Sequence, residues 1–201
     1  MSLNGRNSAA NIERLADFRK SIDYLKELKF LVNKNFLELK DELISNFNNH
    51  PVTREIEGGP NSENISGTLG GYGNLFSFIG FEKGDDPIQP IRKAFNKIVL
   101  TSLKVDRKGG SLSYVMFPSA DDIFRMTPLP WAEGRSWAKG IESGISGLGY
   151  YLNIAEKGRS TAGLQSEEKV GAGGFKNVKY ISSLINDFER KIKTLNGLRI
   201  L

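Results

Sequence analysis

Few side chains in this sequence belong to the types that do chemistry. The 201 residues include no cysteine and a single histidine, His50. Thiolate zinc sites, iron–sulfur clusters, disulfides and a cysteine nucleophile are therefore excluded, and so are metal sites built from several histidines. His50 stands in Asn48-Asn49-His50-Pro51, without the pattern of a serine nucleophile nearby. We interpret it as a polar residue that bonds the last carbonyls of a helix.

Three other motifs contain residues of the types that bind phosphate or a cation. Gly70-Gly71-Tyr72-Gly73-Asn74 resembles a phosphate loop superficially, but it lacks the lysine and serine or threonine that end such a loop. The pairs Asp85-Asp86 and Asp121-Asp122 could bind a hard cation, or they could simply favour the positive end of a helix. We predict no catalytic residue, no cofactor and no metal site, and hence no enzyme.

Clusters of aromatic residues are the more informative signal. Three phenylalanines fall within six positions beside several glycines, and two tryptophans bracket a short segment that contains an arginine. Such residues either fill the protein's own core or are presented to a neighbouring subunit, since aromatic residues and arginine are enriched in interfaces. The glycine-rich setting favours the second interpretation for the phenylalanines. The candidate interface residues are Phe76, Phe78, Phe81, Trp131, Arg135 and Trp137.

The elements that position these residues begin with a long helical segment. From Ile12 to Phe47 the apolar residues recur mostly every three or four positions, which is the period of one helix face. The step from Leu31 to Phe36 is five, and it predicts a break into two helices there. His50-Pro51 is expected to end the segment, because the residue before proline is disfavoured in helical conformation.

Alternation of apolar residues predicts strands farther along the chain. The clearest case is a hairpin over Val99–Phe117, turning at Asp106 to Gly110. A short strand is predicted near Asn74–Phe81, which would place Phe76 and Phe78 on one side, and another near Thr53–Glu57. Helices are predicted over residues 87–97, with Asp86 as the cap, and over 136–152 and 178–195; we also expect a helical turn at 119–124 and an extended link at 126–130.

These elements predict an α+β fold. It has a long N-terminal helical segment, a small antiparallel sheet with a central hairpin, helices packed on one face of the sheet, and a C-terminal helix. Residues 12–48 and 136–152 are expected to supply the helices that cover the sheet. The expected division of the chain is an α+β core domain with the N-terminal helices (1–157), a flexible glycine-rich loop (158–174) and a C-terminal helix (175–201).

The net charge of +5 is concentrated in the last quarter of the chain. Residues 151–201 carry nine basic and five acidic side chains, a net charge of +4. This excess predicts either a solvated lysine-rich face or a surface for nucleic acid or another acidic partner. Residues 57–81 contain no lysine or arginine, so their aromatic rings lack the basic neighbours of a nucleic-acid stacking surface. No apolar run approaches the ~18 residues of a membrane span, and the N-terminus has no apolar segment of a secretory signal, so we expect no membrane contact.

The order of features over residues 20–153 resembles the tail-completion and neck proteins of tailed bacteriophages. The helical start contains Ile22-Asp23-Tyr24-Leu25-Lys26-Glu27-Leu28 and Leu37-Glu38-Leu39-Lys40-Asp41-Glu42-Leu43. It closes with His50-Pro51-Val52-Thr53, and short strands, the hairpin and a helix that opens with Gly134-Arg135-Ser136-Trp137 follow. Such proteins are small α+β proteins that assemble as rings between the portal and the tail.

The resemblance implies a structural virion protein of the neck or tail region, made in the host cytoplasm, that acts in tail completion or as a connector or terminator. It implies a homo-oligomeric ring, with six copies favoured, and contacts with the portal or adaptor and with the tail tube or terminator. DNA would be met only in the lumen of the ring. The alternative is a nucleic-acid-binding protein that uses the basic C-terminal quarter, and a hydrolase of unrecognised type ranks last.

Overall fold

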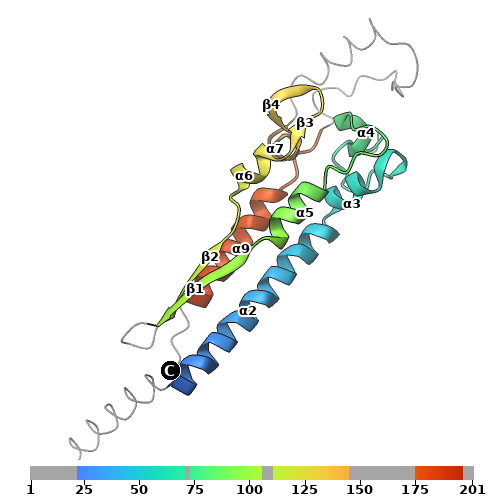
Figure 1. The fold of residues 1–201 in the computed structure, drawn as a ribbon. Coiled ribbons are helices and arrows are strands. Elements are labelled where there is room, and N and C mark those ends of the chain that lie inside the picture. Colours follow the sequence, from blue (N-terminus) through green and yellow to red (C-terminus); the bar gives the residue numbers. More distant parts are fainter. Residues whose placement is uncertain (1–21, 71–72, 106–110, 145–174, 197–201) are drawn as a thin grey trace, which may run out of the picture. The chain divides into compact units, whose positions relative to one another are not determined.

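The computed structural model has the α+β fold that the sequence predicts, with helices at both ends of the described chain and two short antiparallel sheets (Figure 1). The residues that the structure describes are 22–70, 73–105, 111–144 and 175–196. They divide into two compact units. The first unit contains the residues up to 42, those from 98 to 116 and those from 188 on, and the second contains residues 43–97 and 117–187.

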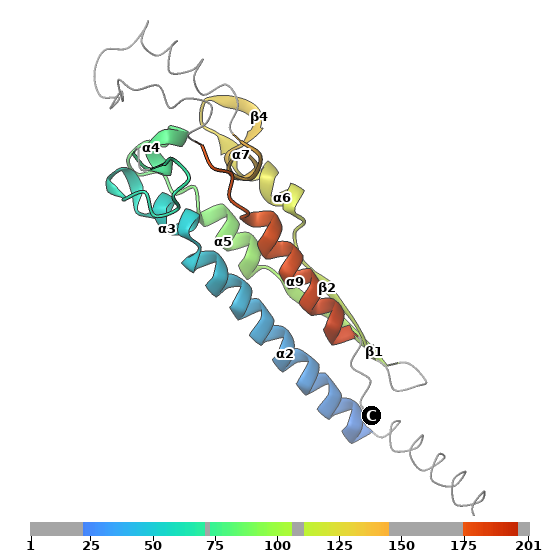
Figure 2. The ribbon, with the colours of Figure 1, turned by 180° about the vertical axis from the view of Figure 1, so that it is seen from behind.

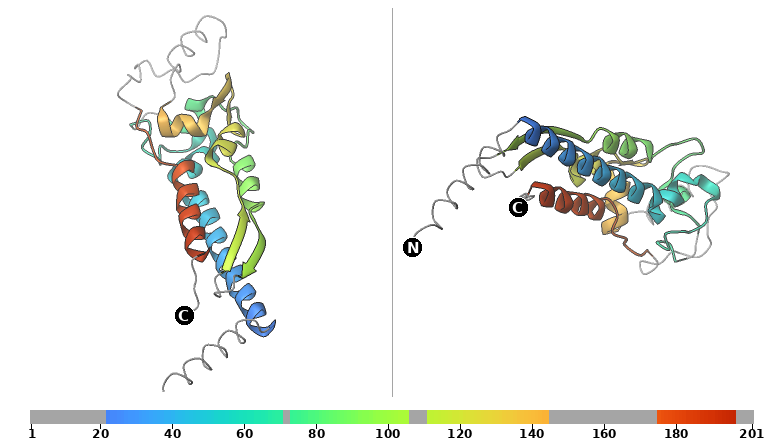
Figure 3. Two further views of the ribbon diagram at one scale, coloured as in Figure 1. Left: turned by 90° about the vertical axis from the view of Figure 1, so that its left-hand side faces the viewer. Right: turned by 90° about the horizontal axis from the view of Figure 1, so that it is seen from below.

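The first unit is built around helix α2 (Ile22–Asn49), which contributes its residues up to 42. The predicted break in this helix is wrong, because the core-facing residues step evenly by four from Leu28 through Val32 to Phe36, all of them buried. Leu31, on which the predicted break depended, is instead exposed. The C-terminal part of helix α9 (Ile181–Asn196) lies alongside α2 (Figure 3), and Lys191 Nζ forms an ion pair with Glu42 Oε1 at 2.5 Å.

The predicted hairpin is confirmed in the same unit. Strand β1 (Val99–Val105) pairs antiparallel with β2 (Ser111–Met116), from Val99 opposite Met116 to Val105 opposite Ser111. The two strands form a sheet of their own among the described residues. A hydrogen bond of 2.9 Å from Lys40 Nζ to the carbonyl of Ile98 links α2 to the start of the hairpin.

The second unit contains the shorter elements. They are α3 (Pro51–Glu57), η1 (Gly59–Asn61), α4 (Leu75–Ile79), α5 (Gln89–Asn96), α6 (Ala120–Arg125), β3 (Pro128–Leu129), β4 (Ala132–Ser136) and α7 (Trp137–Ser143). Helices α3 and α4 contact each other, as Figure 2 shows. In the core, the rings of Phe47 and Phe95 meet edge to face with centroids 5.2 Å apart, and Phe47 stacks on Tyr180 at 6.1 Å.

Several predicted elements of this unit are confirmed, and two details differ. Asp86 Oδ1 accepts a hydrogen bond from Gln89 N, and α6 begins with a capping box between Ser119 and Asp122. The predicted link at residues 126–130 instead contributes β3, which pairs with β4. Helix α7 ends at Gly144 and packs with α6 and β4, in the unit that does not contain the hairpin. The rest of the expected helix at 136–152 and the loop at 158–174 lie outside the described residues.

The strand predicted near Thr53–Glu57 is wrong, since Pro51–Glu57 is the helix α3. Proline suits the first position of a helix for two reasons. Its fixed φ is helical, and the N–H that it lacks would have no acceptor within the helix at that position. The side chain of His50 then caps the new helix, with Nδ1 accepting a hydrogen bond from Val52 N at 3.3 Å. Pro51 therefore ends α2 as predicted, but it also begins the next helix.

The strand predicted near Asn74–Phe81 is also wrong, since its centre is the one-turn helix α4. Asn74 caps the start of this helix, with Oδ1 accepting from Ser77 N at 3.0 Å, and Gly80 ends it with a φ of +91°. Two caps so close together define a single turn, and alternation over so few residues cannot outweigh them. Phe76 and Phe78 consequently point about 200° apart around the helix instead of sharing one side.

This correction predicts unequal effects when the two phenylalanines are replaced one at a time. Phe76 is 3% exposed, whereas Phe78 is half-buried and stacks on Phe175 at 5.8 Å. Phe76→Ala should lower the free energy of unfolding by about 3–5 kcal/mol, and Phe78→Ala by about 1–2 kcal/mol. Urea unfolding of the full chain measures both, and equal losses would contradict the helical assignment.

Candidate functional site

Several of the residues selected from the sequence lie on or beside α4, and a buried carboxylate holds the start of this helix in place. Glu55 on α3 is 0% exposed. Its Oε2 accepts a hydrogen bond from Ser66 N at 2.7 Å, and its Oε1 accepts one from Leu75 N at 2.7 Å. Hydrogen bonds to an ionised acceptor are the stronger kind, so one side chain ties two distant points of the 58–81 segment to α3.

Further polar bonds hold the same segment. Asn74 Nδ2 donates to the carbonyl of Pro60 at 2.8 Å, and the hydroxyls of Ser66 and Thr68 share a hydrogen bond of 2.6 Å. The carbonyl of Thr68 accepts from Lys176 N at 2.8 Å, which joins the segment to the chain that leads into α9. Much of the 58–81 segment is therefore held by side chains and by isolated backbone hydrogen bonds. These bonds satisfy backbone groups that a helix or a sheet would otherwise satisfy.

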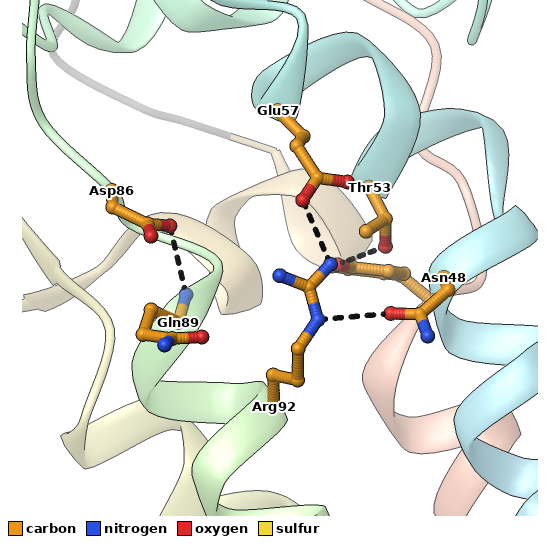
Figure 4. A network of polar contacts seen from close by, with 7 residues as sticks. Asn48, Thr53, Glu57, Asp86, Gln89 and Arg92 are labelled. Carbon is orange, nitrogen blue, oxygen red and sulfur yellow. Dashed lines mark hydrogen bonds and ion pairs between the residues drawn. The ribbon is translucent and has the colours of Figure 1, made fainter.

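Arg92 on α5 links three helices on another side of the unit (Figure 4). Its Nη2 donates to Glu57 Oε1 at 2.8 Å, and its Nε donates to Asn48 Oδ1 at 3.1 Å. The Glu57 carboxylate is about half exposed, so this ion pair is expected to contribute at most about 1 kcal/mol.

A third polar group surrounds Tyr180, which precedes α9. Its buried hydroxyl shares a hydrogen bond of 2.7 Å with Thr53 Oγ1 (drawn from Thr53 in Figure 4), and burial raises the pKa of Tyr180 well above its ordinary value. The ring of His50 lies 4.7 Å from that of Tyr180, and His50 Nε2 lies 3.2 Å from the carbonyl of Lys179. Because Nδ1 already accepts from Val52 N, the proton of the neutral ring belongs on Nε2. His50 therefore bonds α3 and Lys179, and the sequence interpretation that it bonds the last carbonyls of α2 is replaced.

The structure places the predicted interface residues in different environments. Phe76 and Trp137, two of the candidate interface residues, are buried in the core of this unit. Phe81 is half-buried between them, with its ring centroid 5.4 Å from that of Phe76 and 6.0 Å from that of Trp137. Phe78 is half-buried on the opposite side of α4, and Arg135 is exposed on β4.

Trp131, between β3 and β4, closes over the end of α4. Its Nε1 donates a hydrogen bond of 2.7 Å to the carbonyl of Ile79, and the indole lies against Gly80. A Cβ at position 80 would stand 3.1 Å from Trp131 Cδ1, and the φ of +91° there is already unfavourable for any residue except glycine. The half-buried rings of Phe78, Phe81 and Trp131 thus lie on or beside α4.

A cavity of about 330 Å³ lies within the second unit, and of the aromatic residues selected from the sequence only Phe76 is among its described lining residues. Its acidic lining residues already have backbone or side-chain partners: Glu57 pairs with Arg92, Asp85 Oδ2 accepts from Glu82 N at 2.8 Å, and Asp86 Oδ1 accepts from Gln89 N at 3.1 Å. The described lining residues are Ile56, Glu57, Gly59, Pro60, Phe76, Gly84, Asp85, Asp86 and Pro87.

Three of the four residues in the two aspartate pairs of the sequence accept local hydrogen bonds: Asp85 from Glu82 N, Asp86 from Gln89 N, and Asp122 in the capping box of α6. Asp122 accepts hydrogen bonds from the Ser119 hydroxyl at 2.7 Å and from Ser119 N at 3.0 Å, and these bonds lower the pKa of Asp122. Within the described part of the chain, no three histidine, cysteine, aspartate or glutamate side chains are grouped to hold a metal ion. The arrangement around α4 is therefore suited to holding a surface in shape and presenting aromatic rings, while its polar groups are already engaged with one another.

Sequence reasoning missed Glu55, Arg92 and Tyr180, and only the first had a local signal. Val52, Glu55 and Ile56 are spaced by three and four, so a helix over this segment places the carboxylate on the same buried face as the two apolar side chains. The expected strand concealed that spacing. The partners of Arg92 and Tyr180 lie 35 and 127 residues away, and nothing local indicates them.

Comparisons with protein-family models, with curated proteins and with solved structures find no match for this chain. Among the described residues, no helix combines the length and the apolar character that crossing a membrane requires.

The Glu55 contacts predict the effect of changing this carboxylate to an amide. In Glu55→Gln one acceptor becomes an NH2 donor, which leaves the N–H of Ser66 or Leu75 without a partner, so the free energy of unfolding should fall by about 1–3 kcal/mol. The matched variant Glu57→Gln alters only a half-exposed ion pair and should lose about 1 kcal/mol or less. Urea unfolding compares the two, and a larger loss for Glu57→Gln would refute the role given to Glu55.

The environment of His50 predicts a loss of stability in acid. Burial is the larger influence and lowers the pKa of His50, while its bond to Lys179 opposes the change. A folded-state pKa below the ordinary ~6.5 means that the stabilisation is present above about pH 6.5 and is lost as the pH falls through the folded value. His50→Asn keeps a capping acceptor that does not titrate. Between about pH 7.5 and 5 the melting temperature of the natural chain should fall more than that of His50→Asn, and parallel curves would exclude the effect.

Proposed function

We propose that this chain is a structural virion protein of the neck of a tailed bacteriophage, where copies of it form a ring that joins the head to the tail. The observation that carries the proposal is the resemblance of residues 20–153, in particular the junctions His50-Pro51-Val52-Thr53 and Gly134-Arg135-Ser136-Trp137. Both junctions have architectural roles. His50 caps α3, and Ser136 Oγ accepts from Lys139 N at 3.0 Å to cap α7.

The organisation around α4 supports a protein that works through contacts. His50, Asp85, Asp86 and Asp122, which could have done chemistry, accept hydrogen bonds from nearby groups of the chain. The same region carries three half-buried aromatic rings. Phe78 is on α4, a helix whose start is held by Glu55, Phe81 follows that helix, and Trp131 covers its end. Aromatic rings are enriched in protein interfaces, and a surface that is ordered in advance binds with a smaller entropic penalty.

The alternative of nucleic-acid binding has less support. It depends on the basic excess of the C-terminal quarter, and two of the lysines there have acidic partners in the structure. Lys191 pairs with Glu42, and Lys193 Nζ lies 2.8 Å from Glu189 Oε1. Paired charges release fewer counterions from a phosphate backbone, so they contribute less to binding of this kind.

Localisation on virions of the phage that encodes the chain tests the proposal. Gold-labelled antibodies raised against the purified full chain should mark the joint between head and tail in electron micrographs. As a control, the antibody is first mixed with an excess of the purified chain, which should abolish the labelling of the virions. Absence of the chain from purified particles, or label confined to the capsid shell, would refute a role in the neck.

A salt series separates the two functions. We expect fluorescence anisotropy with labelled duplex DNA to show no tight binding by the full chain at either low or moderate salt. A nucleic-acid-binding protein that contacts several phosphates would instead bind at about 50 mM salt and lose about 10³–10⁵ in affinity by 200 mM. That second pattern would favour the alternative.

A further inference from the structure

Helix α2 carries a second apolar stripe outside its core-facing side. Phe30 is 67% exposed and Leu37 is 47% exposed, although both are large apolar residues. They are seven residues apart, and Ile44, which is half-buried, follows at the same interval. Seven residues make about two helical turns, so the three side chains line one face of α2, at the interval of one of the two apolar positions in a helix-pairing heptad.

Two opposite charges border this stripe on the same side. Lys34 follows Phe30 by four positions, and Asp41 follows Leu37 by four, so both lie about 40° around the helix from the apolar residues. Both are exposed, and the one ion pair that Lys34 makes within the helix, to Glu38 at 4.0 Å, is long. This face of α2 thus has a row of apolar side chains with one positive and one negative residue along one edge, seven positions apart.

We propose that this stripe pairs α2 with α2 of a second copy of the chain, antiparallel, about a two-fold axis at Leu37. In this register Leu37 meets the partner's Leu37, and Phe30 meets the partner's Ile44. Lys34 then lies beside the partner's Asp41, and the symmetry forms the same pair twice. The apolar positions and the two charges of this surface thus match those of its own two-fold copy, as a two-fold contact requires.

The charges distinguish this arrangement from a parallel one. In a parallel, in-register pair, residues that flank the seam approach partner residues five positions later in the chain. Lys29 would then face the partner's Lys34, and two like charges would oppose the contact. The antiparallel arrangement replaces that repulsion with two pairs of opposite charge.

The contact is small and is separate from the proposed neck ring. Three apolar positions per copy bury much less than the roughly 1,600 Å² of a typical stable interface, so we expect association of about micromolar strength or weaker. A two-fold contact closes on two copies and does not build a ring. The pairing is a property of the free protein, and its failure would leave the proposed function untouched.

The absence of cysteine from the sequence makes a direct test possible. In the full-length variant Leu37→Cys, the two thiols meet on the symmetry axis and should form a disulfide-linked dimer under mild oxidation. The matched variant Glu38→Cys places its thiol about 100° around the helix and should remain largely monomeric under the same conditions. Equal cross-linking of the two variants, or none for Leu37→Cys at concentrations up to about a millimolar, would overturn the proposal.

Charge exchange tests the register. Lys34→Glu and Asp41→Lys should each weaken association in sedimentation velocity and slow cross-linking at Leu37→Cys, because each places like charges opposite each other. The double exchange Lys34→Glu with Asp41→Lys should restore both towards the original values. If the double exchange associates no better than the single variants, with far-UV circular dichroism showing all three folded, the antiparallel register is wrong.

Discussion

Burying a carboxylate is unfavourable unless donors replace its water, and Glu55 meets this requirement with two backbone N–H groups from different parts of one segment. The N–H of Leu75 belongs to the first turn of α4, where it has no partner within the helix. The same contact therefore satisfies a buried charge and an otherwise open helix end. The position of α4, and with it the rings around it, depends on this contact.

This dependence explains why a segment so rich in glycine has a defined conformation. Between α3 and α4 the described chain has only the short η1 as regular structure. Its backbone groups are bonded instead to Glu55, to Asn74 and to the chain before α9. Each of these partners is remote in sequence or in an adjacent element, so the loop takes its shape from the packed unit around it.

The sequence predicted the fold class, the hairpin Val99–Phe117 and the C-terminal helix, because long periodic patterns report directly on burial. It failed where an element is shorter than about two turns. At Pro51–Glu57 and Leu75–Ile79 the caps His50, Asn74 and Gly80 determine the structure, and alternation over five residues is not decisive. At Leu31 the error was to follow the larger residue, when the smaller Val32 fills the core position.

The candidate site was predictable only in part, since aromatic residues could be selected but not assigned to core or surface. Burial of Phe76 and Trp137 depends on tertiary contacts that no local pattern encodes. The contacts of Trp131 with Ile79 and Gly80 bridge about fifty residues of sequence in the same way.

The difference between the two tryptophans has a spectroscopic consequence. Trp137 is enclosed in the core, whereas Trp131 is half-buried and covers the end of α4, where it bonds the carbonyl of Ile79 and contacts Gly80. Movement of Trp131 away from α4 would admit water to its indole while Trp137 stayed dry. The red edge of the intrinsic emission therefore reports on the local state of α4, and the blue edge reports on the integrity of the core.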